Sequence, residues 1–343
     1  MRDSNGFTFA ELLVTVALAG IVVSAVAMLV VNTERLARAQ SADVDAQQRA
    51  RVLTEALSRD LRLAGAGVDR GPTAGPLSRS FSPVFPRRLG RTRADAPDVA
   101  RSDVITLVHV PATNLQTTLA TAVAPSSGSI TLSPCGGGAF SCPVTVGATL
   151  AVFDPPGRVD LLGILGTGAS STQVRVLGAS AGSFDAGATV ADVVVRGYYF
   201  DAVQSQLRLY DGDSSDQPVV DGVAGLSFQY FGVVEPPRWP QPPLGQDNCL
   251  YDHAGVWRGG VTLSPSDGSL AVLPLTIFSD GPWCGAGGAA FDADLLRVRR
   301  VRVVARLRTS DARPDYRVTF DVAPRNLAIS GVPGPTGGGD SRW

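Results

Sequence analysis

The pattern of apolar and polar residues predicts one long helix at the start of the chain. Leu12–Val31 carries no charge, and its roughly 20 residues would span about 30 Å as a helix, the thickness of a bilayer's hydrocarbon core. No Pro or Gly interrupts Ile21–Ala64, where apolar residues recur at three- and four-residue steps until Gly65 supplies a stop signal. We therefore expect a single helix over Phe7–Leu63, apolar on all sides in 7–31 and amphipathic in 32–65, where it docks on a globular body.

The segment after the helix, 66–101, has no periodicity and contains many Pro and Arg residues. This composition predicts an irregular surface connection. Its arginines could contact an anion such as DNA, but few aromatic residues lie between them and the net charge of the chain is −1, so a solvated loop is preferred.

From 102 to 330 the pattern predicts a β-rich body, so the expected fold class is α+β. Tyr198–Phe200 and Gln206–Tyr210 read as a hairpin. In Arg300–Arg308, apolar residues alternate with arginines, and Tyr316–Val322 repeats the alternation, which predicts an antiparallel pair with one buried face. The Pro/Gly-rich stretch 235–294 is expected to be a long decorated loop that carries a binding surface, and 331–343 a flexible tail.

One carboxylate, Glu11, lies at the leading edge of the apolar run, behind a short polar leader, 1–6. A secretory signal peptide has a shorter apolar region, although Ala37-Arg38-Ala39 offers a cleavage site after this one and would leave Gln40 as the first residue. A plain membrane anchor would explain the length but not the acid, because a carboxylate near a membrane usually has a partner or a function.

The residues Gly6-Phe7-Thr8-Phe9-Ala10-Glu11-Leu12 resemble the type III leader of type IV pilins and pseudopilins. The resemblance implies a type IV pilin-like fold, cleavage by prepilin peptidase between Gly6 and Phe7, and N-methylation of Phe7. It also gives Glu11 a role in assembly, in which its carboxylate pairs with the terminal amine of a neighbouring subunit. The body would lie in the periplasm, held in the inner membrane by one span, and then on the cell-surface pilus.

Three further stretches resemble the W-type (PilW-like) minor pilins: Arg59–Gly65 at the helix end, Val220-Asp221-Gly222-Val223 before an aromatic strand, and Arg325–Leu327. The second also resembles the J-type pseudopilins of type II secretion. The resemblance implies a minor pilin, with other major and minor pilins and an inner-membrane assembly platform as partners, in biogenesis, adhesion, motility or DNA uptake. The large body favours a place near the tip of the fibre, because its bulk would crowd neighbours in the shaft. A secretion pseudopilin and a membrane-tethered extracytoplasmic binding domain are the alternatives.

Four cysteines, Cys135, Cys142, Cys249 and Cys284, fit an exported location. Three pairings are possible, and we favour Cys135–Cys142 with Cys249–Cys284 because each closes a local Gly-rich loop. A zinc site is the rival, but no Cys-x-x-Cys spacing occurs and His253 is the only nearby histidine.

Little else in the sequence points to chemistry. Asp211, Asp213 and Asp216 have a spacing that could supply three oxygens to calcium, but a turn capped by aspartate side chains is the simpler interpretation. His109 falls in an expected strand without a partner acid, Ser or Cys at a telling spacing. With no nucleophile–base set and no phosphate loop in the sequence, we expect no catalysis, no cofactor and no specific nucleic-acid partner.

Overall fold

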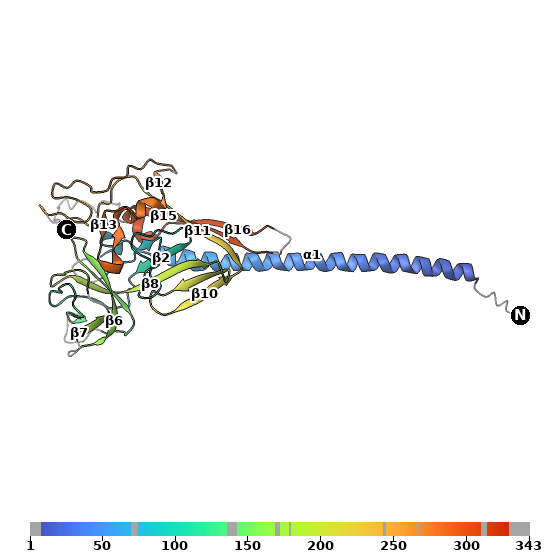
Figure 1. Cartoon of the computed structure of the whole chain (residues 1–343), viewed down its shortest axis with the longest axis horizontal. Coiled ribbons are helices and arrows are strands. Elements are labelled where there is room, and N and C mark those ends of the chain that lie inside the picture. The colour runs from blue at the N-terminus through green and yellow to red at the C-terminus, as the bar shows by residue number, and fades with distance from the viewer. Residues whose placement is uncertain are drawn as a thin grey trace, which may run out of the picture.

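A computed structural model describes residues 8–69, 75–135, 143–168, 172–177, 180–242, 245–266, 268–309 and 314–328. Its dominant element is the helix α1, Phe9–Leu63, which projects from a β-rich body like a stem (Figure 1). The α+β, pilin-like architecture expected from the sequence is confirmed. Gly6 and Phe7 lie outside the described residues.

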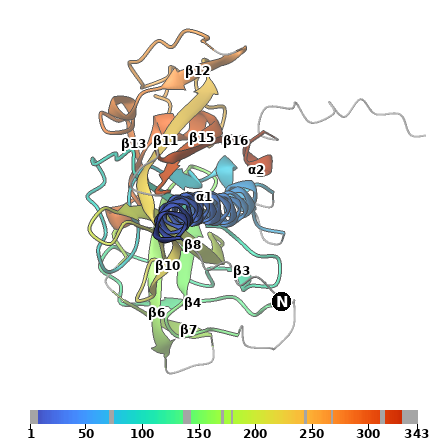
Figure 2. The ribbon, with the colours of Figure 1, turned by 90° about the vertical axis from the view of Figure 1, so that its right-hand side faces the viewer.

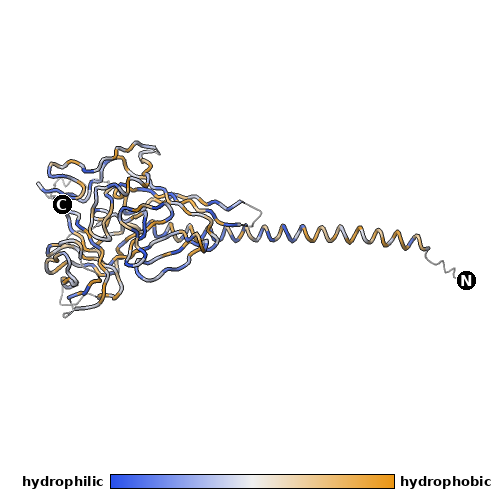
Figure 3. The backbone as a smooth tube through the Cα atoms, viewed as in Figure 1, coloured by the Kyte–Doolittle hydropathy of each residue, from blue (hydrophilic) through white to orange (hydrophobic). Residues whose placement is uncertain are grey.

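Docking of α1 on the body begins later than position 32, where the amphipathic half was expected to start. Ala46 is the first buried residue of the helix, and the buried face continues through Leu53, Leu57 and Leu61. The stem therefore stays exposed past the apolar run to Arg38, and it is only partly buried at Ala39, Ala42 and Asp43 before full burial begins. Figure 3 shows the apolar residues concentrated in the distal part of the stem and mixed with polar ones nearer the body.

The larger of the two main sheets holds ten strands, all paired antiparallel. Their bounds are β1 Val84–Phe85, β2 Val104–His109, β3 Gln116–Thr118, β4 Ser129–Thr131, β5 Thr149–Phe153, β6 Val159–Thr167, β7 Gln173–Leu177, β8 Thr189–Asp201, β9 Gln206–Tyr210 and β10 Asp216–Asp221. The first half of β8 pairs with β3 and β5, and its second half pairs with β2 and β9. This one long strand therefore joins two groups of strands, and the predicted β8–β9 hairpin is present.

The smaller main sheet has the order β12-β11-β15-β16. Its strands are β11 Val223–Val233, β12 Leu270–Leu273, β15 Val298–Leu307 and β16 Tyr316–Val322. Val301, Val303, Ala305 and Leu307 are fully buried, while the arginines between them face outward, as the alternation predicted. A short pair, β13 Trp283–Cys284 with β14 Phe291–Asp292, and the helix α2, Arg325–Ala328, complete the body.

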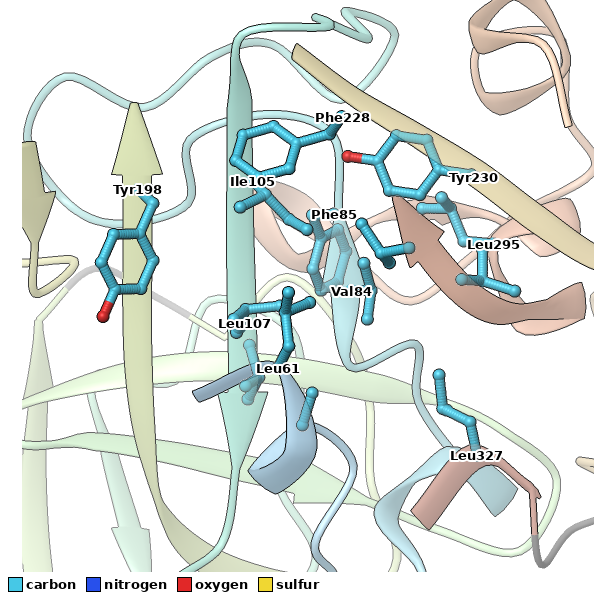
Figure 4. Close-up of a cluster of buried hydrophobic side chains, with 14 of the residues drawn as sticks. Leu61, Val84, Phe85, Ile105, Leu107, Tyr198, Phe228, Tyr230, Leu295 and Leu327 are labelled. Atoms are coloured by element: carbon cyan, nitrogen blue, oxygen red, sulfur yellow. The ribbon is translucent and has the colours of Figure 1, made fainter. Parts of the chain in front are cut away.

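The docked end of α1 lies between the two sheets when the molecule is viewed along the helix (Figure 2). One core cluster joins the helix to both sheets, and Figure 4 shows Leu61 close to Leu107 of β2, with Phe228 and Tyr230 of β11 nearby. A second cluster fills the part of the large sheet around β4–β7.

Two expectations about irregular segments need correction. The connection 66–101 is not solvated throughout: Leu77, Phe81, Val84 and Phe85 are buried in the main core, and a 3₁₀ turn, Leu77–Arg79, and β1 lie within it, whereas 90–101 is mostly exposed and irregular as expected. The stretch 235–294 is also more structured than a loop, because it contributes β12 to the smaller sheet. Both segments contain too few residues per strand for a period to be visible in the sequence.

Candidate assembly site and binding surfaces

The first turn of α1 is closed by a reciprocal pair of hydrogen bonds. Thr8 is the N-cap, and its hydroxyl oxygen accepts a bond from the backbone N–H of Glu11 at 3.3 Å. In return, the Glu11 carboxylate accepts bonds from the backbone N–H and the hydroxyl of Thr8, each at 2.9 Å. This is a capping box, and its Thr-x-x-Glu pattern could have been recognised in the sequence. Glu11 therefore already has a partner within its own chain.

The apolar part of the stem packs against no other described part of the chain. The large residues from Phe9 to Val31 are all exposed, Phe9 by 76% and Leu29 by 64%. An apolar surface of this length on a soluble protein would aggregate, so it requires lipid or neighbouring helices. By length and composition, α1 is able to cross a membrane.

The polar side chains within the apolar run are satisfied locally. The Thr15 hydroxyl donates to the carbonyl of Leu12 at 2.9 Å, and the Ser24 hydroxyl donates to the carbonyl of Gly20 at 2.8 Å. Bonds of this kind hide the hydroxyls from an apolar environment. Among the described residues of the run, Glu11 is therefore the only charged group that an assembly partner could use.

The other end of α1 is fixed to the body by a buried polar contact. The Tyr198 hydroxyl donates to the Asp60 carboxylate at 2.7 Å, and Asp60 is only 5% exposed. Burial and the adjacent Asp60 carboxylate raise the pKa of Tyr198, which keeps it a hydrogen-bond donor. The sequence could not show that Asp60, which lies next to Arg59 near the end of the helix, points inward.

Further along the stem, the Arg49 side chain donates to the backbone carbonyls of Asp221 and Arg308, at 3.3 and 3.0 Å. These carbonyls lie at an end of β10 and just beyond β15, one from each main sheet. The contact therefore fixes the angle at which the stem leaves the body.

The three aspartates considered for calcium are engaged with other groups. Asp211 accepts bonds from the backbone N–H groups of Asp213 and Ser215, the expected aspartate-capped turn. Asp213 pairs with Arg91, and Asp216 pairs with Arg93 and Arg208. These pairs give two arginines of the 66–101 segment a structural role, which argues against a DNA-binding loop.

Other residues singled out in the sequence are placed as follows. His109 is half-buried at the end of β2, and burial lowers its pKa, so it is neutral at pH 7. The Cys249–Cys284 disulfide is present, with its α-carbons 5.1 Å apart. Cys142 lies outside the described residues, and its pairing with Cys135 stays a prediction.

A carboxylate cluster that the sequence analysis missed lies beside this disulfide. Asp280, Asp292 and Asp294 approach within 4.8 Å of one another, and the last two are almost completely buried. Asp292 caps the following 3₁₀ turn by accepting the backbone N–H of Asp294, and it also accepts that of Gly281. Asp294 pairs with Arg297 at 3.0 Å. Burial raises the pKa of Asp292 to about 7 and that of Asp294 to about 6, so protons supply part of the charge balance at neutral pH.

Comparison with known protein families adds one finding. The prokaryotic N-terminal methylation motif matches residues 1–27. This prepilin-type motif implies a type IV pilin-like or pseudopilin protein that is processed by prepilin peptidase and anchored in a membrane by its apolar helix. Proteins with the motif are generally not enzymes. No curated protein matches the chain.

Proposed function

We propose that the chain is a minor pilin of a type IV pilus, of the W-type (PilW-like) group, and that it acts at or near the fibre tip. The observation that carries the proposal is the methylation motif at the start of a stem whose apolar part is exposed along its whole length in the described structure. Neighbouring pilin helices in a fibre would cover that surface.

In this proposal prepilin peptidase cuts between Gly6 and Phe7, and the new amine of Phe7 is methylated. On assembly, Glu11 pairs with the cationic amine of a neighbouring subunit. The capping box supplies a partner for the same carboxylate while the subunit is alone. Assembly then exchanges or extends the contacts of Glu11 and does not bury a bare charge.

The width of the body supports a place at the tip. The two main sheets extend on opposite sides of α1 (Figure 2). In the shaft of a fibre, bodies of this width would crowd one another, whereas the terminal subunit has no neighbour above it. Adhesion, motility and DNA uptake are functions that a tip subunit could support.

A type II secretion pseudopilin of the J-type is the second candidate, because it would carry the same leader and the same kind of stem. Copurification decides between them: pilus subunits would support the first candidate and secretion-system components the second. A membrane-tethered binding domain would keep Met1 and would not enter fibres.

The experiment that tests the proposal combines mass spectrometry of the N-terminus with two substitutions of Glu11. N-methylated Phe7 is expected in mature protein, and intact Met1 or a start at Gln40 would contradict processing. Glu11→Gln keeps the capping box, because glutamine serves in it as well as glutamate. It removes the charge, however, and should therefore abolish incorporation into fibres.

Glu34→Ala is the matched control, because Glu34 is an exposed acid on the same helix and its partner in the described structure is Arg38, at 3.3 Å on that helix. It should leave incorporation unchanged. Normal incorporation of the Glu11→Gln variant would refute the charge-pairing role. Immunogold labelling along the whole fibre would refute the tip position.

A further inference from the structure

A cleft of about 620 Å³ lies between the large sheet and the disulfide-linked segment. One wall is formed by the turn between β5 and β6 and by residues 182–185, and the other by residues 246–249 and 283–286. The backbone N–H of Ala286 donates to the carbonyl of Val159 at 2.9 Å, which ties the walls together at the floor. The Cys249–Cys284 disulfide holds the second wall in shape.

The cleft lies at the end of the body opposite to the exposed stem. In Figure 1, β13 and β6, which contribute to the two walls, both lie at the end away from the N-terminus. On a subunit assembled through its stem, this end faces outward. A ligand in the surroundings of a fibre could reach the cleft there.

Trp283 presents an unused aromatic surface in this cleft. Its side chain is 39% exposed, and its indole N–H has no hydrogen-bond partner among the described residues. The other two tryptophans of the 235–294 stretch have neighbours on their rings: Arg297 lies over Trp257, and Arg79 over Trp239. An exposed indole with a free N–H favours a ligand that offers both an apolar face and a hydrogen-bond acceptor.

The polar groups around Trp283 form two ion pairs, each still open to solvent. Arg158 pairs with Asp185 at 2.9 Å, and Asp247 pairs with Arg258 at 2.6 Å. The side chains of Asp185 and Asp247 are 86% and 65% exposed, so both retain oxygens that can accept further bonds. Arg158 also pairs with Asp154 at 2.5 Å, so the acids exceed the arginines by one. This excess disfavours an anionic ligand and suits a neutral one with several hydroxyl donors.

We propose that this cleft binds a neutral oligosaccharide, with a sugar ring stacked on Trp283 and its hydroxyls bonded to Asp185 and Asp247. One face of a pyranose ring presents C–H groups that pack on an indole, and its edge presents hydroxyls in pairs that match carboxylates and guanidinium groups. The cleft volume is within the range of about 300–1,000 Å³ usual for small-ligand sites. The inference rests on the proposed function in one respect: the cleft faces outward when the subunit is assembled through its stem.

The test measures binding of maltotriose, cellotriose and N,N′,N″-triacetylchitotriose to the full chain by calorimetry and by tryptophan fluorescence. The protein is kept in lauryldimethylamine oxide, a detergent without a sugar headgroup, and sialyllactose serves as the anionic comparison. At least one neutral probe should bind with a Kd of about 1 mM or tighter. Trp283→Ala should weaken that binding at least about five-fold, and Trp283→Phe should restore part of it.

Trp239→Ala is the matched control, because Trp239 is exposed to a similar extent, 41%, and lies outside the cleft. It should leave the Kd unchanged, and every variant must retain the disulfide and the unfolding temperature of the parent. Absence of binding by all three neutral probes, stronger binding of sialyllactose, or an equal loss in the two alanine variants would overturn the proposal. Fibre incorporation of Trp283→Ala is scored separately, so the saccharide site can fail while the pilin function stands.

Discussion

The buried bond between Tyr198 and Asp60 should be one of the strongest single contacts between the stem and the body. In the Tyr198→Phe variant, only the hydroxyl is removed, and the ring can keep its packing in the core shown in Figure 4. The Asp60 oxygen that accepts the hydroxyl then has no other hydrogen bond in the described structure. Its carboxylate remains 5% exposed, so water cannot readily replace the lost donor.

The neighbouring residue provides the comparison from which the magnitude follows. Tyr199 also donates to a carboxylate at 2.7 Å, but its acceptor, Asp216, is paired with Arg93 and Arg208 as well. Loss of a hydrogen bond to a buried charged group costs about 1.5–3 kcal/mol. We therefore expect Tyr198→Phe to lower the free energy of unfolding by about 2 kcal/mol, and Tyr199→Phe by about 1 kcal/mol or less.

Thermal and denaturant unfolding of the full chain in micelles measure the difference. For a body of this size, about 2 kcal/mol corresponds to a fall in Tm of about 4–8 °C. The reasoning is refuted if Tyr198→Phe costs no more than Tyr199→Phe. A restored Tm in the double variant Tyr198→Phe/Asp60→Leu would support it further, since both polar partners are then gone.

Three further changes have defined outcomes. Thr8→Val removes the N-cap and should cost about 1 kcal/mol locally, seen as roughly five-fold faster hydrogen exchange in the first turn of α1; unchanged exchange would contradict the capping box. Asp292 is protonated more readily in the folded chain than in the unfolded one, so it contributes stability at low pH that is lost as the pH rises toward about 7. Asp292→Asn should therefore flatten the dependence of Tm on pH between about 4 and 7, and an unchanged slope would show that Asp292 does not titrate there. Replacing Cys249 and Cys284 by serine opens a loop with a sequence separation of 35 and should cost up to about 4 kcal/mol in denaturant unfolding, while a loss below about 1 kcal/mol would mean that packing alone holds this wall.

The sequence predicted those elements in which the periodicity of apolar residues continues over many positions. The stem is uninterrupted by Pro or Gly after Gly20, and β15 alternates between buried and less buried positions from Arg300 to Leu307, so both could be assigned from pattern alone. The start of full burial at Ala46 could not, because Leu36, Ala39 and Ala46 are all apolar, and only the fold makes the first exposed, the second partly buried and the third buried.

The candidate sites also differ in whether the sequence alone could reveal them. Glu11 and its Thr8 partner are three residues apart and form a local pattern. The cleft joins residues near 158, 185, 247 and 283, which only the folding of the two sheets brings together. Asp60 and Tyr198 are likewise separated by 138 positions, and an inward-pointing acid on a charged helix turn has no local signature.

The capping box at the head of α1 has a consequence for the working cycle of a fibre. In the proposed fibre, a subunit drawn back into the bilayer when a filament is dismantled would regain, within its own first turn, hydrogen-bond donors for the acid that a neighbour had held. The carboxylate would then enter lipid with two donors in place, and a used subunit would return to the same resting state as a newly processed one. Under that proposal, material from retracted filaments could be extended again without repair.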